Sequence, residues 1–147
     1  MRVEAERKEL DYVIIRPYKP GDYEALSQLY LVNWPETDPF HLTVADDFTC
    51  ELGEIIFVAE SGGEMVGGIY YYPRRDHAYL HTLVVKKECR GQGIATEMLK
   101  VAEEQATTDG FARITIDAET DELARYYEAL GFRHNPHTKK GLVKDIG

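Results

Sequence analysis

The stretch "VVKKECRGQGIATEML" at positions 84–99 carries the pattern on which the fold and function of this chain depend. Its first residues suit a strand and its last residues have helical spacing, so a strand is expected to pass into a helix through a turn at residues 90–93. Gly91 and Gly93 remove Cβ atoms where the backbone bends and let amide N–H groups approach a ligand. The helix that follows presents unpaired N–H groups and the positive end of its dipole. The stretch therefore predicts an anion site suited to a phosphate or pyrophosphate.

The charges around this turn strengthen that prediction. Lys86, Lys87 and Arg90 cluster there, in a chain of 147 residues whose formal net charge is −9. The acidic balance argues against a nucleic-acid partner, which needs a basic surface. A local reversal of charge favours a small anionic ligand instead.

Two common phosphate-binding motifs do not fit the turn. A Walker A loop needs Gly-Lys followed by Ser or Thr, which is absent. A dinucleotide fingerprint needs a third glycine where Thr96 stands, and a carboxylate at a strand end about 20 residues further on. A nucleotide-phosphate binder is therefore disfavoured, and a glycine-rich connection without a ligand stays open as an alternative.

The composition predicts one ordinary domain in a reducing compartment. The length matches a single domain, and a hydrophobic fraction of 44% is enough for one core. Cys50 and Cys89 form neither a disulfide framework nor a zinc pattern. The first ten residues lack the apolar segment of a signal peptide, and the apolar runs are too short to span a bilayer. We expect a cytoplasmic protein that does not contact membranes.

The periodicity of the remaining chain predicts alternating strands and helices in one α+β domain over residues 11–147, after a flexible extension at 1–10. The expected strands cover 12–18, 54–60, 65–73, 77–85, 111–118, 131–135 and 141–146. The expected helices cover 23–33, 43–53, 94–109 and 121–130.

Two motifs in this order resemble the GNAT superfamily of N-acetyltransferases. "LVVKKECRGQGIATEML" resembles motif A of that family, with Arg90, Gly93 and Ala95 filling its Arg/Gln-x-x-Gly-x-Gly/Ala signature. "ARYYEALGF" at 124–132 resembles the family's closing helix. The resemblance extends over almost the whole chain and implies a GNAT-type domain with a mixed, mostly antiparallel central sheet and helices on both faces.

The resemblance implies acetyl-CoA as cofactor, or CoA after transfer, with its pyrophosphate on the turn and its pantetheine arm along the preceding strand. The implied cofactor-binding residues are Leu83, Val84, Val85, Arg90, Gly91, Gln92, Gly93, Ile94, Ala95, Thr96, Asp121 and Tyr127. Two positions depart from the family pattern. Lys87 stands where a proline is usual, and Asp121 stands where Asn often contacts the pantetheine arm.

The chemistry implied for such a site is direct attack of a neutral amine on the thioester carbon. Tyr127 holds the family's position for the general acid, and a phenol with an ordinary pKa near 10 is protonated at pH 7. His81 is the candidate base, because alternation would place Tyr79, His81, Leu83 and Val85 on one face of the strand. Glu119, Tyr79 and a water chain are alternative routes for the proton.

The resemblance leaves the acceptor open: a small-molecule amine, a peptide N-terminus or a lysine. No metal is expected, since His77 and His81 are about 13 Å apart on a strand and His134-x-x-His137 has no third ligand. Either a monomer or a homodimer is compatible with these features. The alternative to an enzyme is a module that binds CoA or acyl-CoA as a sensor, without turnover.

Overall fold

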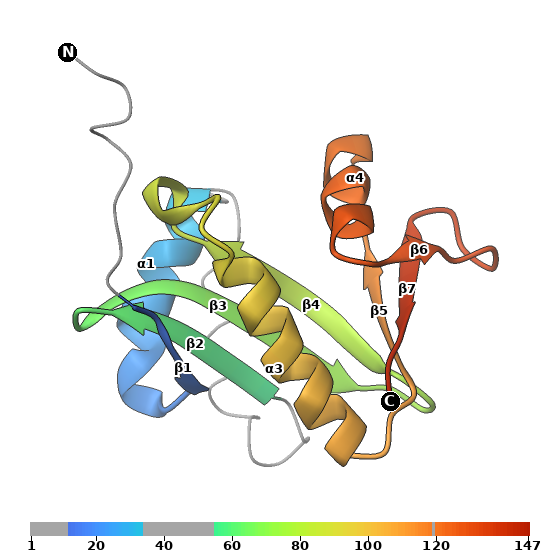
Figure 1. Ribbon diagram of the computed structural model, residues 1–147, viewed down its shortest axis with the longest axis horizontal. Coiled ribbons are helices and arrows are strands. Elements are labelled where there is room, and N and C mark those ends of the chain that lie inside the picture. Colours follow the sequence, from blue (N-terminus) through green and yellow to red (C-terminus); the bar gives the residue numbers. More distant parts are fainter. Residues whose placement is uncertain (1–11, 34–54, 119) are drawn as a thin grey trace.

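The computed structural model describes residues 12–33, 55–118 and 120–147. Its centre is a seven-stranded sheet with the strand order β1-β2-β3-β4-β5-β7-β6 (Figure 1). The strands are β1 (Ile14–Pro17), β2 (Ile55–Ser61), β3 (Glu64–Pro73), β4 (Ala78–Val85), β5 (Arg113–Asp117), β6 (Arg133–His134) and β7 (Gly141–Asp145). Every neighbouring pair is antiparallel except β4 with β5. The expected mixed, mostly antiparallel sheet is confirmed.

Helices cover both faces of this sheet, as expected. The helical elements are η2 (Pro20–Asp22), α1 (Tyr23–Asn33), η3 (Lys87–Cys89), α3 (Ile94–Thr108) and α4 (Asp121–Ala129). Side chains from α3 and α4, including Met98 and Tyr127, belong to the larger core cluster. Leu26 and Leu29 of α1 form a second cluster with Val84 on the opposite face. The expected extension at 1–10 and the expected helix at 43–53 lie outside the described residues.

Two glycines in β3 bring the helices close to the sheet. A Cβ on Gly67 would lie 2.8 Å from Met98 Cε of α3, and a Cβ on Gly68 would lie 2.7 Å from Leu26 Cδ1 of α1. Real Cβ atoms do not approach other atoms so closely, so a larger residue at either position would require the Met98 or Leu26 side chain to shift. The two glycines thus let side chains of α3 and α1 pack directly against β3.

A bulge in β4 corrects one expectation from the sequence. The β3–β4 register passes from Tyr70 opposite Thr82 to Tyr71 opposite Leu80, so His81 is an extra residue in β4. An extra residue reverses the alternation of side chains beyond it. Leu83 therefore lies on the α3 face. His81 contacts the ring of Tyr70, which belongs to the α1 face. The prediction that His81 shares a face with Leu83 and Val85 was wrong.

The parallel pairing of β4 with β5 is short. Only Ala78 with Ile114 and Tyr79 with Thr115 are paired, and β5 pairs along its whole length with β7 instead. Beyond Tyr79 the two strands diverge, with α4 following β5 (Figure 1). Among the described residues, no strand pairs with the second half of β4 on its β5 side, and the candidate site lies along this part of the strand.

Candidate active site

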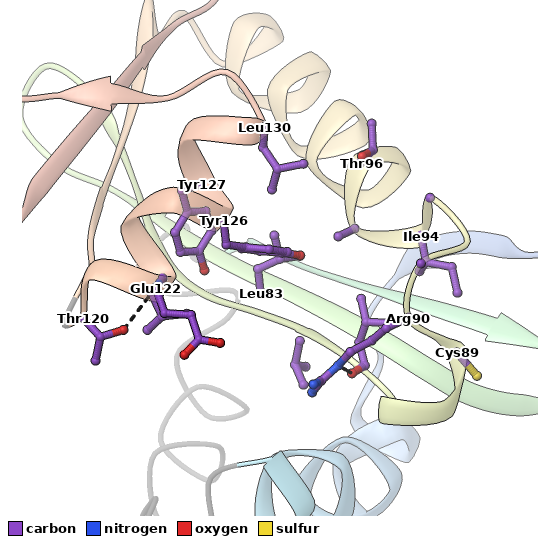
Figure 2. Close-up of a pocket in the computed structure, with 16 residues that line it drawn as sticks. Leu83, Cys89, Arg90, Ile94, Thr96, Thr120, Glu122, Tyr126, Tyr127 and Leu130 are labelled. Atoms are coloured by element: carbon purple, nitrogen blue, oxygen red, sulfur yellow. Dashed lines mark hydrogen bonds between the residues drawn. The ribbon is translucent and has the colours of Figure 1, made fainter. Parts of the chain in front are cut away.

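A pocket of about 680 Å³ lies where β4 and β5 diverge (Figure 2). Three elements form it: the second half of β4, the turn into α3, and one side of α4. Its lining residues are Leu83, Val84, Val85, Cys89, Arg90, Gly91, Gly93, Ile94, Ala95, Thr96, Thr120, Glu122, Leu123, Tyr126, Tyr127 and Leu130. Segments separated by more than 20 positions of sequence thus meet around one cavity.

The glycine turn has the backbone that an anion site needs. Gly91 and Gly93 have φ angles of 80° and 82°, which residues other than glycine rarely adopt. The first bond of α3 runs from the Glu97 amide to the Gly93 carbonyl at 3.0 Å. The amides of residues 94–96 therefore have no partner within the helix. A Cβ on Gly93 would meet no atom within 4 Å, so the space beside this turn is open.

Arg90 supplies positive charge at this end of the pocket. Its Nε donates a hydrogen bond of 3.0 Å to the Val85 carbonyl, which holds the guanidinium beside the cavity (Figure 2). Lys86 is arranged differently: it forms ion pairs with Glu64 and with Glu88. The hydrogen bond to Glu64 raises the pKa of Lys86. Lys86 is thus held by two carboxylates of its own chain, although the sequence suggested it as part of the positive cluster.

Thr120 fixes where α4 begins and which side faces the pocket. Its Oγ1 accepts a hydrogen bond of 3.1 Å from the Leu123 amide, a regular N-cap. The helix and the residue that follows it line the pocket at positions 122, 123, 126, 127 and 130, which are spaced three and four residues apart along one side of the helix. This spacing was readable from the sequence and would have identified Thr120, Leu123 and Leu130 as lining residues. Asp121, expected to bind the cofactor, is exposed and does not line this pocket.

Tyr127 is the buried phenol of the pocket. The residue is 6% exposed, and its ring packs edge-on against Phe132 at 5.8 Å between centroids. Burial, and then the neighbouring Tyr126, raise the pKa of Tyr127. Among the described residues, none forms a hydrogen bond with its hydroxyl. The phenol is therefore protonated at neutral pH, and its proton is not committed to another described group.

Tyr126 lines the same pocket, which the sequence did not predict. It is 42% exposed, and its ring lies 5.2 Å from that of Tyr127. Burial raises the pKa of Tyr126, against a lowering by Arg90. Figure 2 shows both tyrosines on the side of α4 that faces the cavity. The pocket thus holds two phenols, of which the buried one matches the predicted acid.

The other expected residues are divided between this pocket and its surroundings. Gln92 lines an adjacent pocket of about 420 Å³, together with Val13, Ile15 and Glu97. His81 is exposed on the α1 face, with its ring 5.2 Å from Tyr70 and 6.1 Å from Tyr72. Glu119 lies outside the described residues.

The residues that the structure describes show neither a metal site nor a helix that could span a membrane. They contain no group of three or more His, Cys, Asp or Glu placed to hold a metal ion. Over the same ranges, no helix has the length and apolar character required to cross a membrane.

Comparisons with known proteins agree with this geometry. The profile of the Acetyltransferase (GNAT) family matches residues 23–132. Acetyltransferase Atu2258 of Agrobacterium fabrum is 34% identical over 77 residues, which are 52% of this chain and 56% of that protein. The uncharacterized N-acetyltransferase MJ1530 of Methanocaldococcus jannaschii is 27% identical over 124 residues, which are 82% of this chain and 78% of that protein.

Solved structures share the fold. The PaiA N-acetyltransferase of Thermoplasma acidophilum, in complex with coenzyme A, matches with a TM-score of 0.73 and 15% identity, over 92% of this chain and 99% of that one. The family profile covers both sequence motifs and the pocket-lining part of β4, α3 and α4. The family resemblance read from the two motifs is confirmed, and the chain belongs to the GNAT family of N-acetyltransferases.

Proposed function

We propose that this chain binds acetyl-CoA in the pocket between β4 and α4 and transfers the acetyl group to a primary amine by direct attack in a ternary complex. The observation that carries the proposal is the position of the glycine turn. The turn and the N-terminus of α3 lie at one end of a cavity that also contains a buried, protonated tyrosine.

The pocket suits the two chemically different parts of CoA. We assign the pyrophosphate to the amides of residues 91–96, beside the Arg90 guanidinium. The pantetheine arm is assigned to β4, whose edge toward β5 has no pairing beyond Tyr79 in the described chain. Backbone groups at a strand edge can bond the amides of that arm as a further strand would. Leu83 and Leu130 provide apolar contacts.

The reaction needs one proton removed and one proton supplied. The amine nitrogen forms a bond to the thioester carbon, the carbon–sulfur bond breaks, and the sulfur leaves as a thiolate. We assign Tyr127 as the general acid that protonates this thiolate, because burial keeps its phenol protonated. Cys89 is buried in the turn at the pyrophosphate end, and no covalent intermediate on it is needed.

The acceptor is assigned to the α1 face of the sheet. The pocket assigned to the cofactor contains Leu83 and Val85, which belong to the core on the α3 face, and the described pairing of β4 with β5 ends at Tyr79. His81 lies on this α1 face and remains the proposed base. Tyr79 is a poor base near pH 7, since burial and its hydrogen bond to Asp117 raise its pKa to about 12.

Isothermal titration calorimetry with CoA, ATP and NAD tests the assignment of the pocket. We expect CoA to bind clearly more tightly than the other two, because only CoA combines the pyrophosphate with a pantetheine arm. Preference for NAD, or binding of none of the three, would contradict the proposed function.

A further inference from the structure

An aromatic cluster with a fixed guanidinium lies on the α1 face of the sheet. Tyr72 and Tyr79 are directly paired across β3 and β4, with ring centroids 5.3 Å apart. The Cζ atom of Arg74 lies 4.7 Å from the centroid of Tyr72 and 4.9 Å from that of Tyr79. Two cation–π contacts thus hold one guanidinium, although the residue is exposed.

This guanidinium is oriented as well as held. Arg74 Nη2 donates a hydrogen bond of 2.9 Å to the Tyr72 hydroxyl. Among the described residues no carboxylate forms an ion pair with Arg74. A guanidinium has five N–H donors in a rigid fork. Most of them therefore stay available for a ligand, and the fork matches a carboxylate.

A fixed negative charge lies on the other side of the same cluster. The Tyr79 hydroxyl donates a hydrogen bond of 3.0 Å to Asp117 Oδ2, at the end of β5. Arg74 and Asp117 therefore both interact with Tyr79, one with its ring and one with its hydroxyl. A surface with one fixed cation and one fixed anion is complementary to a zwitterion.

The cluster and the proposed cofactor pocket lie along the same strand: Tyr79 belongs to the first half of β4, and residues 83–85 of its second half line the pocket. The pairing of β4 with β5 ends at Tyr79, and the ring of His81 lies 6.1 Å from the ring of Tyr72. Arg74 and His81 therefore contact the same ring. A ligand whose amine is near His81 and whose anionic group is near Arg74 can have only a few bonds between these groups.

Resting on the proposed function, we propose that Arg74 is a specificity-determining residue that binds the carboxylate of an amino-carboxylate acceptor, such as an amino acid or a short peptide. Asp117 favours the ammonium form of the same acceptor as it approaches. A purely cationic acceptor is disfavoured, since Arg74 already covers the two tyrosine rings to which a cation would bind. A phosphate dianion would meet stronger repulsion from Asp117.

Matched acceptors test this proposal. For each of several side chains, thiol release from acetyl-CoA is measured with the amino acid, its amide and its decarboxylated amine. The basicity of the amine increases from the amide to the acid to the decarboxylated amine, so a preference for the acid over both others cannot come from amine basicity. We expect kcat/KM to be about tenfold or more higher for the acid, the size of one charged hydrogen-bonded contact.

Two neighbouring variants assign the preference to Arg74. Arg74→Gln should remove the preference through a higher KM for the acid, with CoA affinity and melting temperature unchanged. Arg75→Gln removes the same charge one position away, and Arg75 is exposed and makes none of these contacts. It should keep the preference.

Three outcomes would overturn the proposal. Equal or better use of the amide or the decarboxylated amine by the wild type excludes the carboxylate contact and leaves the proposed function intact. An equal loss of preference in Arg74→Gln and Arg75→Gln shows a general charge effect. If none of the amines promotes thiol release, the proposed function fails and this inference fails with it.

Discussion

Tyr79 and Thr115 form the last paired step between β4 and β5, and the two strands separate beyond it. The pocket that we assign to acetyl-CoA is lined by residues 83–85 in the second half of β4, whereas Tyr79 in the first half belongs to the cluster with Arg74 and Tyr72. We propose that the cofactor and the acceptor meet along this strand.

Gly93→Val should weaken CoA binding through the turn itself. The φ of 82° disfavours a β-branched residue, and the new side chain would occupy the open space beside the helix N-terminus. Gly110→Val is the matched control, because Gly110 has a φ of 94° and an equally open Cβ position after the other end of α3. We expect both variants to lose stability, about 1–3 kcal/mol from the strained φ, and only Gly93→Val to lose CoA affinity in calorimetry. Normal CoA binding by Gly93→Val would show that the turn only connects β4 to α3 and does not bind the cofactor.

Tyr127→Phe should lower kcat by about 10²–10⁴-fold, the usual range for general acid–base catalysis. Phenylalanine preserves the packing against Phe132, so CoA affinity should stay nearly the same. Tyr126→Phe is the control, since Tyr126 lines the same pocket but is 42% exposed. Steady-state kinetics at saturating acetyl-CoA would show the difference. Loss of kcat in Tyr126→Phe alone would mean that the acid is the exposed phenol.

The alkaline side of the pH profile offers a separate test of the same phenol. Burial raises the pKa of Tyr127 above its ordinary value near 10. Its proton is therefore present throughout the range from pH 7 to 10, and kcat should not decline there. A decline of kcat near pH 8 that disappears in Tyr127→Phe would contradict this account of the buried phenol.

The acid side of the profile tests His81. If its imidazole accepts the amine proton, log kcat/KM should rise with pH through a pKa near that of imidazole, about 6.5. His81→Ala should remove this limb and have its largest effect above that pKa, where the wild-type imidazole is unprotonated and can accept the proton. An unchanged profile in the variant would assign the proton to Glu119 or to solvent.

Stability at low pH should depend on Asp22. Arg16 Nη1 and Nη2 donate to the two Asp22 oxygens at 2.8 Å each, and this hydrogen bonding lowers the pKa of the carboxyl. The pair stabilises the fold fully above about pH 3.9, the pKa of the Asp22 carboxyl in the unfolded chain. This stabilisation is lost as the pH falls through the lower pKa of the same carboxyl in the folded protein. Asp22→Asn should therefore cost about 2 kcal/mol at pH 7 in urea unfolding, with a smaller difference at the lowest pH.

Glu60→Gln is the control for that measurement. Glu60 accepts from the same guanidinium at 3.3 Å and is more exposed than Asp22. Glu60→Gln should therefore lower the free energy of unfolding by less than Asp22→Asn does. An equal cost of the two variants, or a difference for Asp22→Asn that does not change with pH, would show that the Arg16–Asp22 pair is not the cause.

Local patterns were enough to predict most of the fold. The expected strand at 77–85 is observed at Ala78–Val85, and the expected helix at 121–130 is observed at Asp121–Ala129. Both depend on periodicity and capping within about ten residues. The prediction for the strand at 131–135 was less exact, because β6 contains only Arg133 and His134. Strand ends depend on pairing partners, which local patterns do not specify.

Three features of the site depend on contacts between distant residues and could not be read from the sequence. The bulge that moves His81 to the α1 face follows from the register of β3 with β4. The ion pair of Lys86 with Glu64 joins residues 22 positions apart. The cluster of Arg74 with Tyr72 and Tyr79 requires the β3–β4 hairpin to be folded. Each needs the tertiary structure, whereas the glycine turn and the stripe of α4 do not.

Thiol release from acetyl-CoA with a panel of small amines, amino acids and peptides tests the central claim most directly. We predict release above the hydrolysis background with at least one class of amine, a stoichiometric N-acetyl product by mass spectrometry, and a strong loss of rate in Tyr127→Phe. A chain that binds CoA tightly but shows no amine-dependent release with any acceptor, or the same rate in Tyr127→Phe and wild type, would contradict the assignment of this pocket as an acetyltransferase active site.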